Sequence, residues 1–192
     1  MKIIGFVGLP GSGKSVASDV ARGMGLKVLV MGDVIRQEAA ARGLEPSDEN
    51  LGKVGNMLRA SEGPEAVARR TLERIGKEKI IVVDGLRSKA EADLFRARST
   101  EFHLVNIVAP ANSRVRWIES RGRSDDPRST SALSRASASE GQMVSALEQR
   151  VGREMGWGMN EAMKEADLVL MNKGDLEQFR ESARKLLKAL TT

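Results

Sequence analysis

Residues 3–15 read IIGFVGLPGSGKS, and this stretch decides the fold. Its first part, Ile3–Val7, is a short apolar run, which is typical of a strand buried on both faces of a parallel sheet. Residues 8–15 match the pattern G-x-x-x-x-G-K-[ST] at every required position. A helix face follows, because apolar residues recur at helical spacing at Val16, Ala17, Val20, Ala21 and Met24. The order of strand, glycine-rich loop and helix predicts an α/β fold whose ligand lies at this loop.

The loop has the chemistry of a phosphate-binding loop of the Walker A type. Its glycines let the backbone turn tightly with the N–H groups pointing inward, which makes a concave site for phosphate oxygens. Lys14 is expected to reach the β- and γ-phosphates, and Ser15 offers a hydroxyl to Mg²⁺. The helix dipole adds positive potential at the same place. The predicted ATP site therefore comprises Gly8, Leu9, Pro10, Gly11, Ser12, Gly13, Lys14 and Ser15.

The composition limits the classes of function. A length of 192 residues fits one domain, and the absence of cysteine excludes disulfides, thiolate metal sites and a cysteine nucleophile. The net charge is +5, but tyrosine is absent and aromatic residues are 3%, so we expect a phosphate-binding complement of arginines rather than a nucleic-acid surface. The chain has no run of about 18 apolar residues. We expect a cytoplasmic monomer or homodimer that does not bind membranes.

Strand and helix patterns alternate along the whole chain. Four further strands are predicted at residues 27–31, 79–83, 102–108 and 167–171. This alternation predicts a parallel sheet with helices on both faces and with ligands at the carboxyl ends of the strands. We expect one domain, 1–192, with a helical acceptor-binding excursion at 33–76 and a lid region at 121–146. Within the lid, residues 129–139 are dominated by serine and alanine and are predicted to be mobile without nucleotide.

Local signals set the expected helix ends. Ser47 is a candidate N-cap, Pro64 is well placed to open a helix, and Ser88 with Glu91 matches a capping box. Asp175 and Gln178 begin the last amphipathic helix, in the same pattern.

Three further motifs follow predicted strands, and with the phosphate loop they resemble the nucleoside monophosphate kinases. They are GDVIR at 32–36, DGLR at 84–87 and RGRSDD at 121–126. The resemblance implies that Arg36 and Arg87 hold the acceptor phosphate. It also implies that Asp84 lies near Mg²⁺ and that Arg121 and Arg123 close over the transferring phosphoryl group. If the acceptor is dephospho-CoA instead, a ribose hydroxyl receives the phosphate, and Asp33 is the candidate for the carboxylate that deprotonates it.

A closer resemblance covers nearly the whole chain. The segments EPSDENLGKV (45–54), GPEAVA (63–68) and RSDDP (123–127), with the pattern A-D-x-x-x-x-N-x-G at 166–174, resemble an uncharacterised, mainly archaeal family of adenylate-kinase-like P-loop proteins. This resemblance implies a three-layer P-loop kinase fold, and ATP with Mg²⁺ as cofactors.

Three departures from these families affect the site. DGLR lacks the proline of the adenylate kinase motif and is one residue shorter. Residues 128–144 look like an insertion, so Arg150 and Arg153 are the first candidates for the second lid arginine and Arg135 is the runner-up. Trp117 replaces an arginine that the family tends to have, so it is either an adenine-stacking residue or part of a buried helix face.

Asp84 and the segment 172–175 each have two interpretations. Because an acidic group directly after a buried strand is costly without a partner, we expect Mg²⁺ to be held by Ser15 and Asp84. Residues 172–175 read NKGD, which matches the guanine-recognition element of GTPases, although Asp175 also fits a helix cap. Dephospho-CoA kinases share the late A-D-x-x-x-x-N-x-G pattern, and in that interpretation Asn172 and Gly174 border the adenine.

The sequence thus predicts ATP-dependent phosphoryl transfer to a small phosphorylated acceptor, in the first place a nucleoside monophosphate such as AMP. A dephospho-CoA kinase, a GTPase and a regulatory nucleotide-binding protein remain as alternatives.

Overall fold

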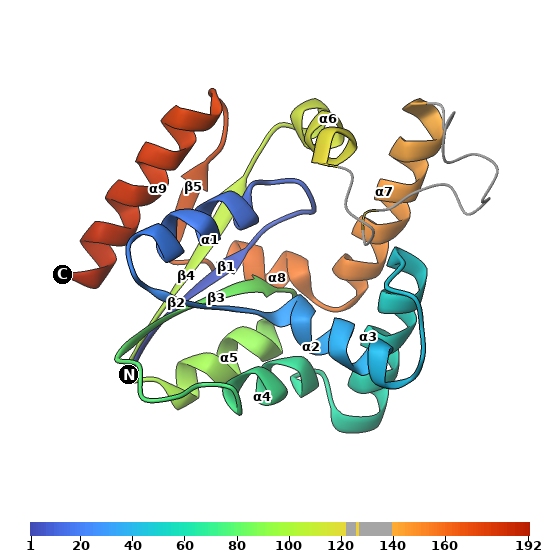
Figure 1. Cartoon of the computed structure of the whole chain (residues 1–192), viewed down its shortest axis with the longest axis horizontal. Coiled ribbons are helices and arrows are strands. Elements are labelled where there is room, and N and C mark those ends of the chain that lie inside the picture. Colours follow the sequence, from blue (N-terminus) through green and yellow to red (C-terminus); the bar gives the residue numbers. More distant parts are fainter. Residues whose placement is uncertain (122–125, 127–139) are drawn as a thin grey trace.

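The computed structural model describes residues 1–121, 126 and 140–192. Its centre is a five-stranded parallel sheet with the spatial order β2-β3-β1-β4-β5 (Figure 1). The strands are β1 (Lys2–Val7), β2 (Lys27–Val30), β3 (Ile80–Leu86), β4 (Glu101–Val108) and β5 (Leu168–Met171). Because β1 lies between β3 and β4, the loop that follows it emerges at the middle of the carboxyl edge of the sheet.

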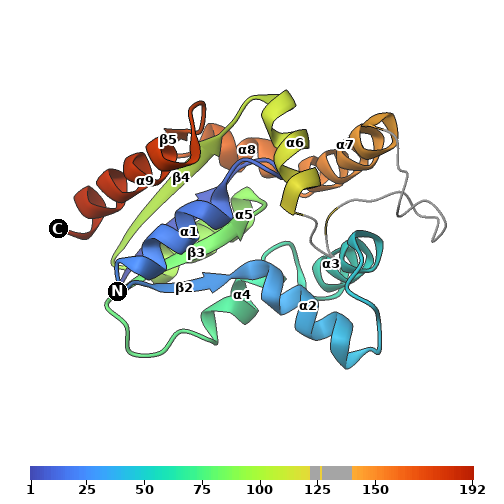
Figure 2. The same cartoon turned by 45° about the horizontal axis from the view of Figure 1, so that its top comes forward.

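One face of the sheet is covered by α1 (Lys14–Gly23) and α9 (Leu176–Thr191) (Figure 2). Both helices are strongly amphipathic, and each turns its apolar stripe toward the sheet. The stripe of α9 includes Phe179, Ala183 and Leu187, each at most 2% exposed. These residues share one apolar cluster with Phe6, Val105 and Leu170 of the strands. This packing fixes the direction in which α1 leaves the loop.

The other face is covered by α2 (Met31–Ala41), α4 (Ala66–Leu72), α5 (Lys89–Arg98) and α8 (Met159–Lys164). Their buried side chains form the largest apolar cluster with the strands, around Phe95, which is fully buried. The strands read as continuous apolar runs because helices cover both faces of the sheet.

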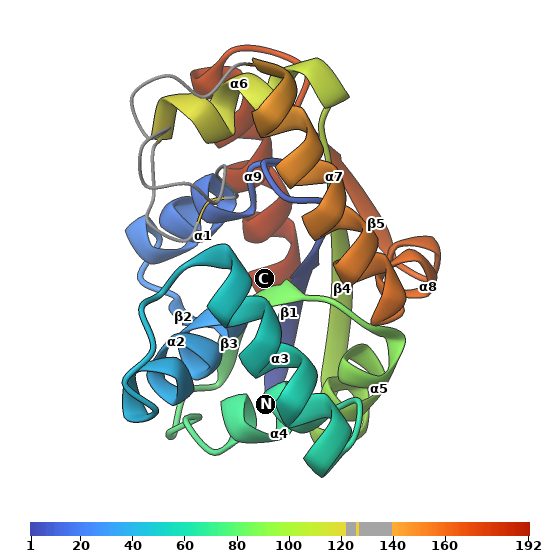
Figure 3. The ribbon, with the colours of Figure 1, turned by 90° about the vertical axis from the view of Figure 1, so that its right-hand side faces the viewer.

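Three helices lie beyond the carboxyl edge of the sheet: α3 (Asp48–Glu62), α6 (Ala111–Arg121) and α7 (Glu140–Gly156). Helices α3 and α7 lie side by side in Figure 3, and they are in contact. The predicted cap of α3 is confirmed, because the Ser47 hydroxyl oxygen accepts a hydrogen bond from the Asn50 N–H at 3.2 Å. Helix α3, which belongs to the predicted acceptor-binding excursion, is thus in contact with α7, which comes from the C-terminal part of the chain.

The parallel α/β fold is confirmed, but several predicted boundaries are wrong. Strand β3 continues to Leu86 rather than ending at Val83, because Asp84 still pairs with Phe6 of β1. Met31 begins α2 instead of ending β2. The helix expected to open at Pro64 begins at Ala66, with Glu65 as its N-cap residue. Helix α8 was not predicted, since six residues are too few to show a helical period.

Two other predictions concern particular segments. The serine- and alanine-rich segment 129–139 lies outside the described residues. Among the helices that the structure describes, none is long and apolar enough to span a membrane.

Candidate nucleotide and acceptor site

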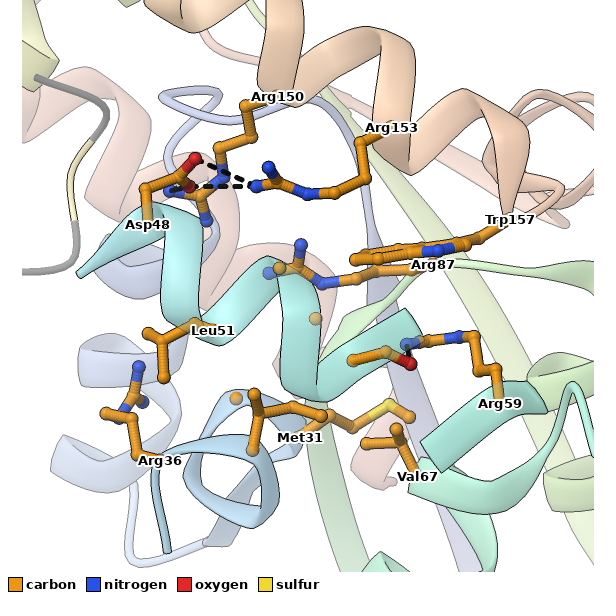
Figure 4. A pocket seen from close by; sticks show the side chains of 15 residues that line it. Met31, Arg36, Asp48, Leu51, Arg59, Val67, Arg87, Arg150, Arg153 and Trp157 are labelled. Atoms are coloured by element: carbon orange, nitrogen blue, oxygen red, sulfur yellow. Dashed lines mark hydrogen bonds and ion pairs between the residues drawn. The ribbon is translucent and has the colours of Figure 1, made fainter. Parts of the chain in front are cut away.

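Two adjoining cavities open at the carboxyl edge of the sheet. The larger one, of about 520 Å³, is lined by the phosphate loop from Pro10 to Ser15, by Asp84 of β3 and by the segment after β5. The smaller one, of about 50 Å³, lies among α2, α3 and α7 (Figure 4). Among the residues that the structure describes, three arginines line both cavities: Arg36, Arg87 and Arg150. We call the larger cavity the nucleotide cavity and the smaller one the acceptor cavity.

At Gly8 and Gly13, the backbone of the phosphate loop has a conformation and a closeness to its neighbours that only glycine fits. Gly8 has a φ of 143°, and a Cβ there would lie 2.3 Å from the carbonyl oxygen of Ile107. Gly13 has a φ of 109°, and a Cβ there would lie 2.6 Å from Nδ2 of Asn172. The Lys14 ammonium donates hydrogen bonds to the carbonyl oxygens of Gly8 at 2.5 Å and Leu9 at 3.0 Å. The lysine therefore lies folded over the loop, next to the place where phosphates would bind.

The segment after β5 is attached to the phosphate loop. The Asn172 side-chain amide is buried and donates to the Ser12 carbonyl oxygen at 3.0 Å. Asn172 and Gly174 both line the nucleotide cavity. Asp175 caps α9, since its Oδ1 accepts from the Gln178 N–H at 2.8 Å, which confirms the predicted cap. The aspartate of the NKGD segment thus has a structural task.

Helix α6 borders the nucleotide cavity and its loop through Trp117, Ser120 and Arg114. Trp117 lines the cavity, so its indole is not simply part of a buried helix face. Arg114 donates from Nη1 to the carbonyl oxygen of Pro10 at 3.2 Å, and burial lowers the pKa of its guanidinium. Arg114 was not among the predicted site residues, because one arginine on a helix carries no specific signal.

Ser15 and Asp84, the predicted metal ligands, line the same cavity. The Asp84 carboxylate is 6% exposed, and its Oδ2 accepts a hydrogen bond from the Ser18 hydroxyl at 2.8 Å. Mg²⁺ is the partner that the sequence predicts for this carboxylate, and Ser18 of α1 provides a protein partner in addition. A hydroxyl and a carboxylate beside an open cavity are a suitable oxygen donor set for a Mg²⁺ ion that keeps several waters.

The acceptor cavity is surrounded by guanidinium groups that are paired with carboxylates (Figure 4). Arg87 donates from Nη1 to Oε1 of Glu154, and Arg150 donates from Nε to the same oxygen at 3.0 Å. Arg153 donates to Asp48 at 2.9 Å. These pairs connect β3, α3 and α7 around one small space.

A second buried carboxylate, that of Glu91, pairs with Arg59, which lines the acceptor cavity. Glu91 is fully buried, and Arg59 donates from Nη2 to its Oε1 at 2.6 Å. Its other oxygen accepts from the backbone N–H of Arg87 at 2.7 Å. The predicted capping box is therefore only half formed: the Ser88 hydroxyl accepts from the Glu91 N–H at 3.1 Å, but the Glu91 carboxylate turns away from the cap to these two donors.

Positive charge is concentrated at Arg87. Burial, followed by the neighbouring guanidinium groups of Arg150 and Arg59, lowers the pKa of Arg87 to about 9. The burial term disfavours the charged guanidinium, and the smaller contributions of Arg150 and Arg59 reflect several guanidinium groups crowded around one small cavity.

Trp157 forms one wall of the acceptor cavity. The guanidinium carbon of Arg59 lies 4.2 Å from the centroid of the indole ring, a cation–π arrangement. The indole N–H donates to Oδ1 of Asn56 at 2.7 Å. A Cβ on Gly55 would lie 3.3 Å from the indole, so α3 approaches the ring closely because it carries a glycine there.

Sequence reasoning missed Asp48, Arg59, Glu154 and Trp157. One signal was available: Arg150, Arg153, Glu154 and Trp157 recur at i, i+3, i+4 and i+7, which places them on one side of a helix. Asp48 and Arg59 gave no such signal, because their partners lie on α7 and α5.

The predicted acceptor residues are only partly brought together. Arg36 lines both cavities and donates to Oδ1 of Asp33 at 2.6 Å. Asp33 itself is not among the described residues that line either cavity. Arg121 ends α6, and the structure describes nothing of its side chain. Arg123 and Arg135 lie outside the described residues.

Comparisons with known proteins agree with this architecture. A family profile described as an AAA domain matches residues 7–134. The UPF0200 protein of Methanothrix thermoacetophila is 52% identical over 190 residues, which is 99% of this chain and 98% of the relative.

Two solved kinases show the same fold. The shikimate kinase of Bacteroides thetaiotaomicron superposes with a TM-score of 0.60 at 11% identity, over 99% of this chain and 98% of its own. A gluconokinase of Sinorhizobium meliloti superposes with a TM-score of 0.57 at 16% identity, over 98% of this chain and 93% of its own. At these identities the likeness is one of fold. By its sequence and its architecture together, the chain belongs to the UPF0200 family, with an AAA domain that has the fold of P-loop kinases.

Proposed function

We propose that this protein transfers the γ-phosphoryl group of ATP to a small phosphorylated acceptor, in the first place a nucleoside monophosphate such as AMP. The observation that carries the proposal is the shared lining of the two cavities. Arg36, Arg87 and Arg150 face both the cavity at the phosphate loop and the cavity among α2, α3 and α7. Phosphoryl transfer needs positive charge between donor and acceptor phosphates, and these three side chains supply it there.

The donor would bind in the nucleotide cavity. Its phosphates fit the concave backbone from Gly8 to Ser15, with the Lys14 ammonium moving from the loop carbonyls to the β- and γ-phosphates. The base would lie between the segment after β5, at Asn172 and Gly174, and Trp117 of α6. A planar indole beside the cavity suits stacking on any base.

Ser15 and Asp84 would hold Mg²⁺. When bound, the ion neutralises charge on the phosphate oxygens of the donor. Ser18 keeps the Asp84 carboxylate oriented toward the cavity through its hydroxyl. The protein side chains thus position the donor and contribute the electrostatic complement.

The acceptor would enter the smaller cavity with its phosphate toward Arg36, Arg87 and Arg150. Guanidinium groups grip a phosphate with two parallel hydrogen bonds, which fixes its orientation for an in-line attack. Arg153, and the predicted lid arginines Arg121 and Arg123, would complete the charge around the transferring group. Transfer of this kind needs positioning and exclusion of water more than covalent chemistry by the protein.

An acceptor panel tests the proposal. ADP formation from ATP and Mg²⁺ is followed with AMP, GMP, CMP, UMP, dephospho-CoA or no acceptor, for the wild type, Arg36→Lys and Asp33→Asn. We expect turnover with a nucleoside monophosphate, reduced in Arg36→Lys. Activity only with dephospho-CoA, lost in Asp33→Asn, would assign the alternative acceptor, because a ribose hydroxyl needs a deprotonating carboxylate.

Two further results, one from this panel and one from the same assay run with GTP in place of ATP, would reject a kinase. Tight ATP binding without transfer to any acceptor would favour a regulatory nucleotide-binding protein. Hydrolysis of GTP in preference to ATP, without an acceptor, would favour a GTPase.

A further inference from the structure

One arginine at the boundary of the two cavities is shared by two carboxylates with different surroundings. Arg150 donates from Nε to Oε1 of Glu154 at 3.0 Å, and its Nη1 lies 3.3 Å from Oδ1 of Asp48. The Glu154 side chain is 2% exposed, whereas that of Asp48 is 18% exposed. The two carboxylates therefore differ in how easily each can exchange its partner for water or a ligand.

Glu154 is a buried residue that is fixed by two arginines. It lies one helical turn after Arg150 on α7, and it also accepts from Arg87, which follows β3. A buried carboxylate without its cations is strongly destabilising, so Glu154 has to keep both guanidinium groups. Because Arg87 and Arg150 line both cavities, the position of Glu154 sets the direction in which they present their remaining N–H groups.

Asp48 is held differently. It lines the acceptor cavity, and both of its carboxylate oxygens accept from Nη2 of Arg153, at 3.0 and 2.9 Å (Figure 4). It is also the first residue of α3, where the helix dipole stabilises a negative charge. When Asp48 gives up its arginines, it keeps some contact with water and the favourable helix dipole, which Glu154 at 2% exposed does not have.

We infer that Asp48 occupies, in the ligand-free protein, the place of the acceptor's anionic group, and that Glu154 is the residue that positions the arginines for that group. A phosphate entering the acceptor cavity displaces Asp48 from Arg150 and Arg153, while Glu154 stays in place. This inference rests on the proposed function, because it takes the smaller cavity to be the acceptor site. It deepens that function by assigning opposite tasks to two carboxylates on one arginine.

The consequence is an opposite effect of two equivalent substitutions. Asp48→Asn removes a competitor, so an anion should bind more tightly. Glu154→Gln removes the group that orients Arg87 and Arg150, so the same anion should bind more weakly. General electrostatics alone predicts tighter binding for both, because each substitution removes one negative charge near a cationic cavity.

The experiment titrates inorganic phosphate into protein whose phosphate loop is saturated with ADP and Mg²⁺. Trp157 reports on the acceptor cavity, and in a Trp117→Phe background it is the only tryptophan, because the chain has two. We expect Asp48→Asn to bind phosphate about threefold more tightly, the scale of a partly exposed ion pair. We expect Glu154→Gln to bind it about tenfold more weakly, the scale of a lost buried charge-assisted hydrogen bond.

A matched control is Glu49→Gln. Glu49 follows Asp48 in the first turn of α3, but it pairs with the exposed Lys53 at 2.7 Å, so its neutralisation should leave phosphate affinity unchanged. Thermal unfolding of each variant checks that the fold is retained. If Glu154→Gln does not fold, Glu154→Asp keeps the charge at a shorter reach and should still weaken phosphate binding.

The inference is overturned if both substitutions tighten binding, if Asp48→Asn leaves it unchanged or weakens it, or if Trp157 shows no phosphate binding in the wild type. Failure of the proposed function looks different. In that case the phosphate affinities follow the expected order, but no acceptor in the panel receives a phosphoryl group.

Discussion

The side-chain amide of Asn172 donates a hydrogen bond to the carbonyl oxygen of Ser12, a residue 160 positions earlier in the chain. The contact joins the segment after β5 to the phosphate loop after β1, although β4 lies between these two strands. Gly13 makes the approach possible, because any side chain there would meet the amide nitrogen. The segment that we propose to border the nucleotide base and the loop that we propose to bind its phosphates are thus held in one arrangement.

Asn172→Ala tests this connection. The substitution leaves the Ser12 carbonyl without its donor, so we expect ATP affinity and the free energy of unfolding each to fall by about 1–3 kcal/mol. Calorimetric titration of ATP and chemical denaturation measure the two quantities. Lys173→Ala, at the exposed neighbouring position, is the control and should change neither. Unchanged ATP affinity in Asn172→Ala would show that the loop keeps its shape without this contact.

Lys14→Ala should abolish phosphoryl transfer with the fold intact. The ammonium donates to two carbonyls of the loop and lines the nucleotide cavity, so we expect its removal to cost little stability. Loss of a preorganised charge at the transferring phosphoryl group lowers kcat by about 100-fold or more. The measurement is ADP formation with the best acceptor, with circular dichroism to check the fold. Near-normal turnover by a folded variant would reject the kinase assignment.

Arg36→Lys should weaken acceptor binding selectively. A lysine keeps the charge but cannot make two parallel hydrogen bonds to one phosphate, so we expect AMP affinity to fall by about 1–3 kcal/mol. ATP affinity should change little, because the phosphate loop supplies most of its contacts. Separate titrations of AMP and ATP measure the two values. An equal loss of affinity for AMP and ATP would mean that Arg36 does not contact the acceptor alone but also contacts the donor.

Gly52→Ala should disturb the acceptor cavity through Arg153. A Cβ on Gly52 would lie 2.7 Å from the guanidinium carbon of Arg153, so the guanidinium has to move away. Because the obstacle is the end of a flexible side chain, we expect the loss to appear in AMP affinity, by about 1–2 kcal/mol, the lower part of the range for overpacking.

Gly152→Ala is the matched control for this substitution. Gly152 lies on α7 beside Arg153, and a Cβ there would meet nothing within 4 Å. Alanine should therefore raise the free energy of unfolding by up to about 1 kcal/mol through helix propensity, with AMP affinity unchanged. A loss of AMP affinity in Gly152→Ala would mean that the effect of Gly52→Ala does not come from Arg153.

Signals that act over a few residues could be interpreted from the sequence alone. The strands, the phosphate loop and the caps at Ser47 and Asp175 each depend on neighbours within about four positions, where spacing determines geometry. Asp84 lies near the carboxyl end of β3, although it is part of the strand rather than directly after it as predicted. Even here the strand continues past its apolar run, because Asp84 pairs with Phe6 of β1 and Leu86 pairs with Val7, while Gly85, with a φ of 95°, lies unpaired at an irregularity between them.

Only the tertiary structure decided which charges meet. The sequence shows arginines at positions 36, 59, 87, 150 and 153, but it does not show that they surround one cavity. The reason is physical: each partner lies on a different element, so Asp48 of α3 reaches Arg153 of α7 and Glu91 of α5 reaches Arg59 of α3. Such contacts follow from how helices pack on the sheet, and packing depends on the whole set of apolar faces at once. The sequence by itself determined a parallel α/β fold with a phosphate loop, and the packing of α3 against α7 determined the cavity beside it.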